Sequence, residues 1–456
     1  MLLLNTPRKP FLSPLVLLGF LLLTACPEGP EPPQRDTTIL LSVVNTGVTT
    51  VSLNVSVEDT TDTWTFGLAR NDSIILSAEV TGADTVVRDG GLAPATAYRY
   101  RAYWLKNGEA VDSSAEVLAT TLDTTSHRFS WTIDTLGDYG SYLNDVAIID
   151  ENNIWVVGYI KTDSATYNAA RWDGREWELK KVMPQNGYVT PVESIYAFQK
   201  NNIWFGRGGL PIHWDGDEFY QYTPAKGEHP GQPSIDAIWG TSSSDIYFVG
   251  NSGSIVHYDG SGFERMESGT DVDLKDVWGV VDEETGAVHI WACGADNNPD
   301  YSVILALING KWQTIYERFS SGNGNTIDDE PYFSPKATTI WTAGESGSLW
   351  VGGGWGVYTL NDKYRPTDYT YIDIENEVGY FSFPWKLRGN HENDIFIVGE
   401  YGSLFHFNGI SWKRYSELQN NDHRFKSIDV TPKFIVVAGS DNSEFLRKAI
   451  VLKGNR

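Results

Sequence analysis

One phrase recurs along most of the chain: a short apolar run, rich in aromatic residues, that ends in glycine. The phrase closes at Gly158, Gly206, Gly250, Gly294, Gly352, Gly399 and Gly439, with separations of 48, 44, 44, 58, 47 and 40 residues. A period in the forties is typical of arrays in which each unit is one small sheet that buries its apolar face against its neighbours. The repeat therefore predicts an all-β architecture for residues 127–456.

Each unit has four parts, which are clearest around Gly250. The expected strands there are 235–240, 245–250, 254–260 and 263–268. Asp259-Gly260 is a strong signal for a tight hairpin between the third strand and the fourth. The same signal returns at Asp173-Gly174, Asp215-Gly216, Asn309-Gly310 and Asn408-Gly409, and an aromatic residue follows each time, at Trp177, Phe219, Trp312 and Trp412. One aromatic residue per unit at one register predicts packing between sheets, as in a β-propeller.

The last unit lacks a fourth strand, because the chain ends soon after Gly439. Residues 128–135 stand directly before the first unit, and Trp131 matches the aromatic residue that opens a fourth strand elsewhere. A ring of sheets must close or leave exposed edges. We therefore expect residues 128–135 to complete the sheet formed by 425–453, which gives seven blades with a strand-swapped (velcro) closure. Six or eight blades stay open, since residues 319–384 depart from the repeat.

The units resemble the tryptophan-glycine propeller repeats of bacterial exported proteins. The resemblance rests on phrases such as "DVWG" at 276–279 and "AIWG" at 237–240. It implies the fold but no fixed chemistry, so function has to be argued from a site rather than from the architecture.

Residues 37–122 form a separate region of seven short alternating runs, which predicts a β-sandwich. Leu92, Pro94, Thr96 and Tyr98 follow the spacing L-x-P-x-T-x-Y, and Trp64 stands where a core tryptophan is expected. These residues resemble the fibronectin type III domain, in which the tyrosine forms a corner before the sixth strand. The resemblance implies a spacer or docking module.

The N-terminus reads as an export signal. Arg8 and Lys9 precede an apolar run at 11–23, and the sequence "LTAC" ends at Cys26. A basic start, a short apolar segment and small residues at a cleavage site are typical of a signal peptide. The ending resembles the lipobox of bacterial lipoproteins, which implies removal of residues 1–25, a diacylglyceryl thioether on the Cys26 sulfur and an acylated amine, with palmitate as the expected acyl group.

Residues 26–36 carry four prolines and predict a stiff tether between the lipidated cysteine and the folded part. We expect a lipid-anchored protein of the cell envelope, in the outer membrane and facing the periplasm or the surface. Removal of 1–25 takes away Arg8, Lys9 and no acidic residue, so the net charge changes from −24 to −26. Such a charge disfavours nucleic acid as a partner.

Several residue groups are candidates for chemistry. The segment 368–385 interrupts the repeat with aromatic residues that could hold a sugar ring or a peptide, or could simply cap the core. The candidate ligand-binding residues are Tyr369, Tyr371, Tyr380, Phe381 and Trp385. Asp328, Asp329 and Glu330 are weak calcium candidates, because adjacent acids in a loop are also simply solvated. No cofactor is otherwise expected.

Histidines and cysteines point to structure rather than to catalysis. His213, His257 and His406 each precede the hairpin of their own unit, so they hold one repeat position and are interpreted as packing residues. With Cys26 lipidated, Cys293 has no disulfide partner in the chain, and it is interpreted as a small buried strand residue.

The sequence predicts a non-enzymatic binding or scaffold module for a protein or glycan, with the bilayer as a second partner through Cys26. The alternative is a glycan-active enzyme, a hydrolase or lyase, with paired carboxylates in the central pocket of the propeller. That alternative requires two acids from different blades within roughly 5–10 Å of each other. No individual catalytic residue is singled out.

Overall fold

A computed structural model describes residues 3–5, 38–58, 62–183, 188–223, 234–282, 285–297, 300–320, 336–344, 347–354, 356–360, 363–364, 369–443 and 447–456. The chain divides into two compact units, Met1–Thr124 and Thr125–Arg456. Cys26 and the calcium candidates Asp328, Asp329 and Glu330 lie outside the described residues. No helix in the described part of the chain is long and apolar enough to cross a membrane.

The first unit contains two antiparallel sheets. One sheet has the order β1 (Leu3–Asn5), β6 (Asp84–Gly90), β3 (Thr50–Val57) and β2 (Ile39–Thr46). The other has the order β5 (Ser73–Thr81), β4 (Thr63–Arg70), β7 (Ala97–Lys106) and β8 (Glu109–Ser113), with β9 (Val117–Thr120) also paired to β7. The prediction of seven strands missed β8, because nearly all of its side chains are exposed and it lacks apolar alternation.

Of the residues that the sequence singled out, Trp64 and Leu92 belong to the core of the first unit, and Tyr98 packs against it. Trp64 is buried, and its indole nitrogen donates a hydrogen bond to the Gly82 carbonyl at 2.7 Å. The Tyr98 hydroxyl accepts a hydrogen bond from the Ala93 backbone N–H at 2.9 Å, which ties the start of β7 to the turn before it.

The second unit contains seven four-stranded antiparallel sheets among its described residues. Sheet 1 has β11 (Tyr142–Asp150), β12 (Asn153–Lys161), β13 (Thr166–Trp172) and β14 (Trp177–Lys180). Sheet 2 has β15 (Ser194–Gln199), β16 (Asn202–Arg207), β17 (Leu210–Trp214) and β18 (Phe219–Gln221). Sheet 3 has β19 (Ile235–Ser242), β20 (Asp245–Gly250), β21 (Ser254–Tyr258) and β22 (Phe263–Met266). Sheet 4 has β23 (Leu274–Val281), β24 (Val288–Asn297), β25 (Asp300–Ile308) and β26 (Lys311–Ser320).

The C-terminal sheets follow the same plan. Sheet 5 has β27 (Ala337–Trp341), β28 (Leu349–Gly353), β29 (Gly356–Leu360) and β30 (Tyr369–Ile372). Sheet 6 has β31 (Pro384–His391), β32 (Asp394–Gly399), β33 (Leu404–Phe407) and β34 (Trp412–Arg414), and sheet 7 has β35 (His423–Val430), β36 (Phe434–Asp441), β37 (Lys448–Asn455) and β10 (Ser130–Leu136). Two short helices, α1 (Ile374–Val378) and a 3-10 turn (Ser416–Leu418), lie between strands.

The first strands of neighbouring sheets contact one another in the order β11, β15, β19, β23, β27, β31 and β35, and β35 contacts β11. This cyclic order is like that of a propeller, with the first strands innermost. Apolar clusters fill the spaces between successive sheets.

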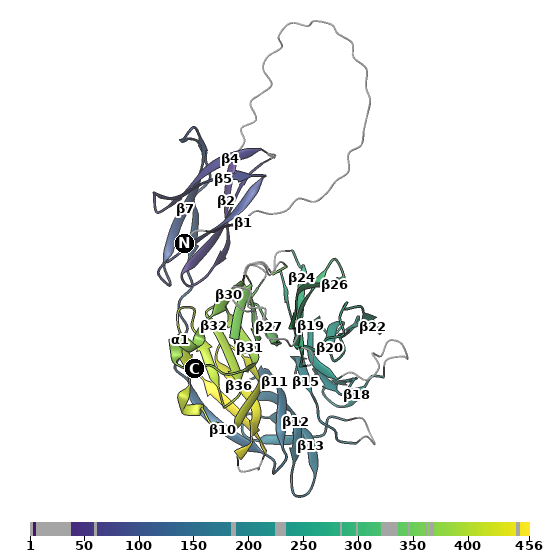
Figure 1. The fold of residues 1–456 in the computed structure, drawn as a ribbon. Coiled ribbons are helices and arrows are strands. Elements are labelled where there is room, and N and C mark those ends of the chain that lie inside the picture. The colour runs from purple at the N-terminus through teal and green to yellow at the C-terminus, as the bar shows by residue number, and fades with distance from the viewer. Residues whose placement is uncertain are drawn as a thin grey trace, which may run out of the picture. The chain divides into compact units, whose positions relative to one another are not determined.

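The opening strand of the second unit completes its last sheet. β10 pairs antiparallel with β37, from Ser130 opposite Asn455 to Leu136 opposite Ala449. Figure 1 shows β10, in blue, beside the yellow C-terminal strands. The predicted pairing of residues 128–135 with the C-terminal sheet is therefore confirmed, with the strand beginning and ending slightly later than expected.

Six first strands carry a β-bulge at the same place, one residue after the strand pairs with the repeated glycine. The extra residues are Asn144, Asp236, Lys275, Thr338, Trp385 and Lys426. A bulge opposes two residues to one and changes the direction in which a side chain points.

The repeated glycine has a steric cause at this bulge. A Cβ on Gly250 would lie 1.7 Å from the Ser234 carbonyl oxygen, and one on Gly294 would lie 2.1 Å from that of Asp273. Glycine therefore allows the first strand to approach closely. In sheet 5 the glycine beside the bulge is Gly353, so the sequence alignment on Gly352 was wrong by one residue.

A second set of glycines receives aromatic rings from the preceding sheet. A Cβ on Gly240 would lie 3.1 Å from Phe198, and one on Gly279 would lie 2.5 Å from the Trp239 ring. Each tryptophan-glycine pair thus contacts both neighbouring sheets. The ring of Trp239 packs on Gly279 of the next sheet, and Gly240 is contacted by the ring of Phe198 from the previous sheet.

Candidate functional site

A cavity of about 440 Å³, here called the axial cavity, lies where the first strands converge. All six bulged residues line it, and Glu193, directly before β15, supplies the corresponding position from sheet 2. Every sheet of the second unit therefore contributes a side chain to one cavity, and the bulge is the feature that places most of them there.

Charged groups are unevenly distributed around the axial cavity. The carboxylates come from the consecutive sheets 1, 2 and 3, as Asp145, Glu193 and Asp236. The ammonium groups come from or directly precede strands of sheets 4, 5, 6 and 7, as Lys275, Lys336, Lys386 and Lys426. One half of the cavity is thus acidic and the other half basic, although the chain as a whole carries a net charge of −24.

Asp236 and Lys275 meet at one boundary between the two halves. The Lys275 ammonium donates to Asp236 at 2.9 Å and to Asp273 at 3.1 Å. Burial alone lowers the pKa of Lys275, but the two carboxylates raise it above its usual value. This pair is therefore already neutralised within the protein.

Asp145 is engaged at the other boundary. Its carboxylate accepts hydrogen bonds from the backbone N–H of Val146 and of Ile195, each at 3.0 Å, and from the Ser427 hydroxyl at 2.6 Å. These bonds join sheets 7, 1 and 2. Asp145 therefore has a structural role that leaves it little capacity for a ligand.

Glu193 differs from the other two carboxylates. One of its oxygens accepts a hydrogen bond from the Gly208 backbone N–H at 2.8 Å, and Asp236 lies near enough to disfavour its charge. Burial, more than Asp236, raises the pKa of Glu193 to about 7. The group therefore exchanges a proton readily at neutral pH.

Lys426 lies over the face of Trp385, with its ammonium 3.0 Å from the ring centroid. The Trp385 indole nitrogen donates to Glu400 at 2.8 Å, and the Nε atom of Arg424 lies 2.8 Å from the same carboxylate oxygen. Burial, and then the Arg424 guanidinium, lower the pKa of Lys426 to about 7. The ring thus positions the ammonium at the cavity wall.

Asp276 binds Lys386, one of the lysines of the basic half, and lies buried among the first strands. It is fully buried and accepts from Lys386 at 2.9 Å and from both Arg388 terminal nitrogens at 2.7 and 2.9 Å. It also accepts from the Thr339 hydroxyl at 2.9 Å and the Ile340 N–H at 3.1 Å. Burial alone raises the pKa of Asp276, but the two cations hold it below its usual range. Sheets 4, 5 and 6 are joined at this carboxylate.

A narrower cavity of about 260 Å³ continues along the first strands and shares Asp145, Lys386 and Ser427 with the axial cavity. Trp278 and Asp429 also line it. Burial raises the pKa of Asp429 to about 6, while its carboxylate accepts from the Ile148 N–H at 2.7 Å.

The five aromatic residues predicted to bind a ligand do not lie together. Trp385 lines the axial cavity, whereas Tyr380 and Phe381 pack into the apolar cluster between sheets 5 and 6. Tyr369 and Tyr371 lie on β30, the last strand of sheet 5, and Tyr371 is 40% exposed. Of the five predicted residues, one therefore lines the cavity, two lie in the core and two lie on a fourth strand; Phe383, from the same insertion, also lines the cavity.

The three repeat histidines each bond within their own sheet. The Nε2 atom of His213 lies 2.9 Å from the Asn202 amide oxygen, and that of His257 lies 2.8 Å from Asp245. His406 does the same with Asp394 at 2.9 Å. Each bond joins the third strand to the start of the second. Among the described residues, no three potential metal ligands gather in one place.

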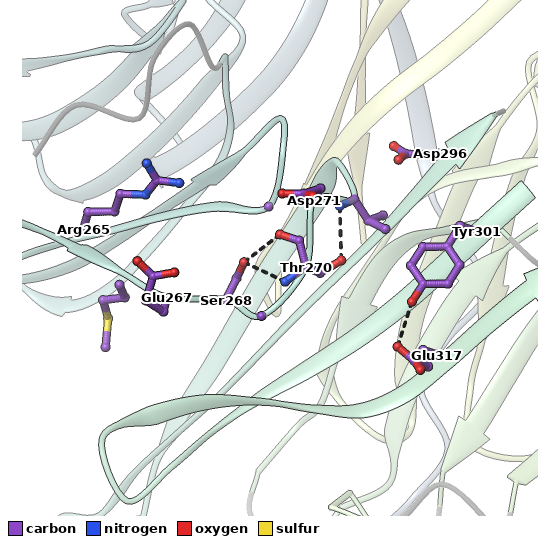
Figure 2. Close-up of a pocket in the computed structure, with 12 residues that line it drawn as sticks. Arg265, Glu267, Ser268, Thr270, Asp271, Asp296, Tyr301 and Glu317 are labelled. Carbon is purple, nitrogen blue, oxygen red and sulfur yellow. Dashed lines mark hydrogen bonds between the residues drawn. The ribbon is translucent and has the colours of Figure 1, made fainter. Parts of the chain in front are cut away.

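A larger cavity of about 750 Å³ lies between sheets 3 and 4, away from the first strands. Figure 2 shows its wall, where the Tyr301 hydroxyl donates to Glu317 and Ser268 bonds within its own turn to Thr270. Only two neighbouring sheets contribute to it. The axial cavity, which draws on all seven sheets, is therefore the stronger candidate for a binding site.

No family model and no curated protein matches the sequence. Among solved structures, a computationally designed protein aligns with 69% of this chain and 98% of its own length, at 11% identity and a TM-score of 0.42. Two structures of an extracellular domain from B. thetaiotaomicron, described as part of a one-component or hybrid two-component system, align with 77% of this chain at 14% and 13% identity, with TM-scores of 0.45 and 0.46. The aligned part spans 44% of each of these two chains.

Proposed function

We propose that this chain is an exported lipoprotein of the cell envelope that binds a protein or glycan ligand without transforming it. The signal-like residues 1–25, Cys26 in its lipobox-like context and the Pro-rich 26–36 support the anchor. The bonded Tyr98 and buried Trp64 support a fibronectin type III-like spacer at 37–122. The anchor leaves the folded units outside the bilayer.

The second unit is proposed to be a seven-bladed β-propeller closed by strand exchange. Seven four-stranded sheets, the cyclic contacts of their first strands and the pairing of β10 with β37 support this assignment. Closure at the seventh sheet brings β35 beside β11 and so completes the wall of the axial cavity.

The axial cavity is the proposed binding site, and one observation carries this assignment. A bulge recurs in six first strands, and each extra side chain lines the same cavity although the six side chains are of five different types. A feature needed only for packing would place similar residues at equivalent positions, as the glycines and histidines of the repeat do. Different side chains on one common frame are what recognition of a particular ligand requires.

Binding is favoured over glycan cleavage by the state of the three carboxylates. A glycosidase needs two carboxyl groups that are free to exchange protons or attack. Asp145 accepts three hydrogen bonds from the fold, and Asp236 is paired with Lys275. Of these three carboxylates, Glu193 is the one that has the environment of a general acid.

The proposal is tested by comparing cavity and rim variants of the full-length chain on glycan and peptide arrays. Trp385→Ala should weaken binding of the captured ligand at least tenfold, because it removes the ring that holds Lys426 in place. The matched control is Tyr371→Ala, an exposed aromatic residue of the same insertion that does not line the cavity. It should bind as the unchanged protein does.

The opposite pattern would contradict the proposal. If Tyr371→Ala abolished binding while Trp385→Ala retained it, the ligand would contact the outer strand of sheet 5 rather than the axial cavity.

A further inference from the structure

The separation of charges in the axial cavity indicates what kind of group it takes. Resting on the proposed function, we propose that the ligand is a zwitterion of amino-acid or dipeptide size. Its carboxylate would face the lysines of sheets 4 to 7, and its ammonium would face the carboxylates of sheets 1 to 3. The proposed ligand is therefore a free amino acid, or a short peptide that carries the same ammonium and carboxylate groups.

The charged side chains of the axial cavity that are available to a ligand are of both signs. Asp236 and Lys275 neutralise each other, and Asp145 is held by three hydrogen bonds. In the acidic half, Glu193 accepts hydrogen bonds from the backbone N–H groups of Gly208, at 2.8 Å, and of Glu193 itself, which leaves part of the roughly four lone-pair sites of the carboxylate open. It therefore has acceptor capacity for an ammonium group.

In the basic half, two lysines have no hydrogen-bond partner among the residues that the structure describes. Lys426 is held only by its contact with the Trp385 ring, and Lys336 directly precedes β27 on the neighbouring side of the cavity. Lys386 is engaged with Asp276. Lys336 and Lys426 are thus the ammonium groups available to a carboxylate, and a carboxylate has two oxygens to offer them.

A zwitterion is the only simple charge type that meets opposite charges on both sides. A dianion would approach Glu193, and a cation would approach Lys336 and Lys426, so each would meet a like charge across the cavity. The cavity volume of about 440 Å³ is near the lower end of small-molecule sites, which suits an amino acid or a dipeptide.

The test measures binding of blocked and unblocked probes to the full-length protein by calorimetry. The probes are the twenty amino acids and Ala-X dipeptides, then the N-acetyl form and the C-terminal amide of the best binder. We expect the zwitterion to bind at least tenfold more tightly than either blocked form. Each blocked form removes one charge while keeping the rest of the molecule.

Two variants assign the halves of the cavity. Glu193→Gln should remove most of the preference over the N-acetyl probe and leave the preference over the amide. Lys426→Gln should do the reverse, and Lys336→Gln serves the same purpose if Lys426→Gln does not fold. Both substitutions keep a polar side chain of similar size, so loss of packing is a minor effect.

The outcomes separate this inference from the proposed function. Equal binding of zwitterion and blocked probes, or no binding of any probe while the array ligand still depends on Trp385, would overturn the zwitterion and leave the axial site standing. If the array ligand also binds independently of Trp385, both the zwitterion proposal and the axial binding site are contradicted.

Discussion

Replacing Asp276 by alanine should lower the free energy of unfolding of the second unit by about 3–5 kcal/mol, the usual cost of removing one partner from a buried ion pair. The carboxylate is fully buried, and its loss leaves the Lys386 ammonium and the Arg388 guanidinium facing each other without a counter-charge. It also removes the acceptor for Thr339 and Ile340. Urea unfolding followed by tryptophan fluorescence reports on this unit, since all tryptophans except Trp64 and Trp104 lie in it.

The matched control is Asp273→Ala. Asp273 pairs with Lys275 at 3.1 Å, but about a third of each side chain is exposed, so its loss should cost only about 0–1 kcal/mol. A change below about 1 kcal/mol in Asp276→Ala would show that the buried carboxylate is not what joins the three sheets.

The pH dependence of the free energy of unfolding is a second test of the role of Asp276. The folded pKa of Asp276 lies below its unfolded value of about 3.9, so its stabilising effect is complete above that pH and is lost as the pH falls through the folded pKa. The unchanged protein should therefore lose stability below pH about 4 more steeply than Asp276→Ala does.

Replacing Cys26 by serine should release the protein from the membrane almost completely. In the proposed lipoprotein, the lipobox-like "LTAC" would direct acyl chains to this one sulfur and to the amine that cleavage exposes. Each buried methylene contributes about 0.8 kcal/mol, so loss of several chains changes membrane partition by many orders of magnitude. Palmitate labelling followed by fractionation measures the effect.

The control for that experiment is Cys293→Ser. It removes the other cysteine of the chain, which is buried in β24, and leaves Cys26 in place. Label retained in Cys26→Ser, or lost in Cys293→Ser, would show that Cys26 is not the lipidated residue.

The repeat made much of the second unit predictable. The apolar run ending in glycine located the second strand of each sheet, and Trp131 located the strand that pairs with the C-terminal sheet. These features are local in sequence and periodic, so one chain is enough to reveal them. The hairpin pairs also behaved as expected: the side chains of Asp173 and Asp259 accept hydrogen bonds from the backbone two and three residues later.

The axial cavity was not predictable in the same way. A bulge shifts register by one residue, so Lys426 and Asp236 read in sequence as ordinary polar residues of a strand. Asp276 and Arg388 are more than a hundred residues apart, and nothing local links them. A usable signal does exist, because each bulged residue follows the residue that pairs with the repeated glycine, but it is visible only once the pairing is known.

The aromatic insertion shows the limit of composition as a guide. Six aromatic residues within 368–385 suggested a ligand surface, yet Phe381 packs against Phe405 and Tyr380 lies under the Arg414 guanidinium. Whether an aromatic ring faces a core or a cavity depends on strand register, which composition does not encode.

The central claim is that the opening strand of the second unit completes its last sheet, so that seven first strands share one cavity. Ser130 and Asn455 are paired residues at the exposed ends of β10 and β37. Paired Cα atoms in antiparallel strands are about 4.5–5.5 Å apart, within the range that a disulfide spans.

The measurement is peptide mass spectrometry of the Ser130→Cys, Asn455→Cys variant after mild oxidation. We expect an intramolecular cross-link in nearly all molecules, and none in Ser130→Cys, Ser244→Cys, whose second site lies in sheet 3. Absence of the first cross-link, or its formation only between molecules, would contradict the closed ring and the cavity that depends on it.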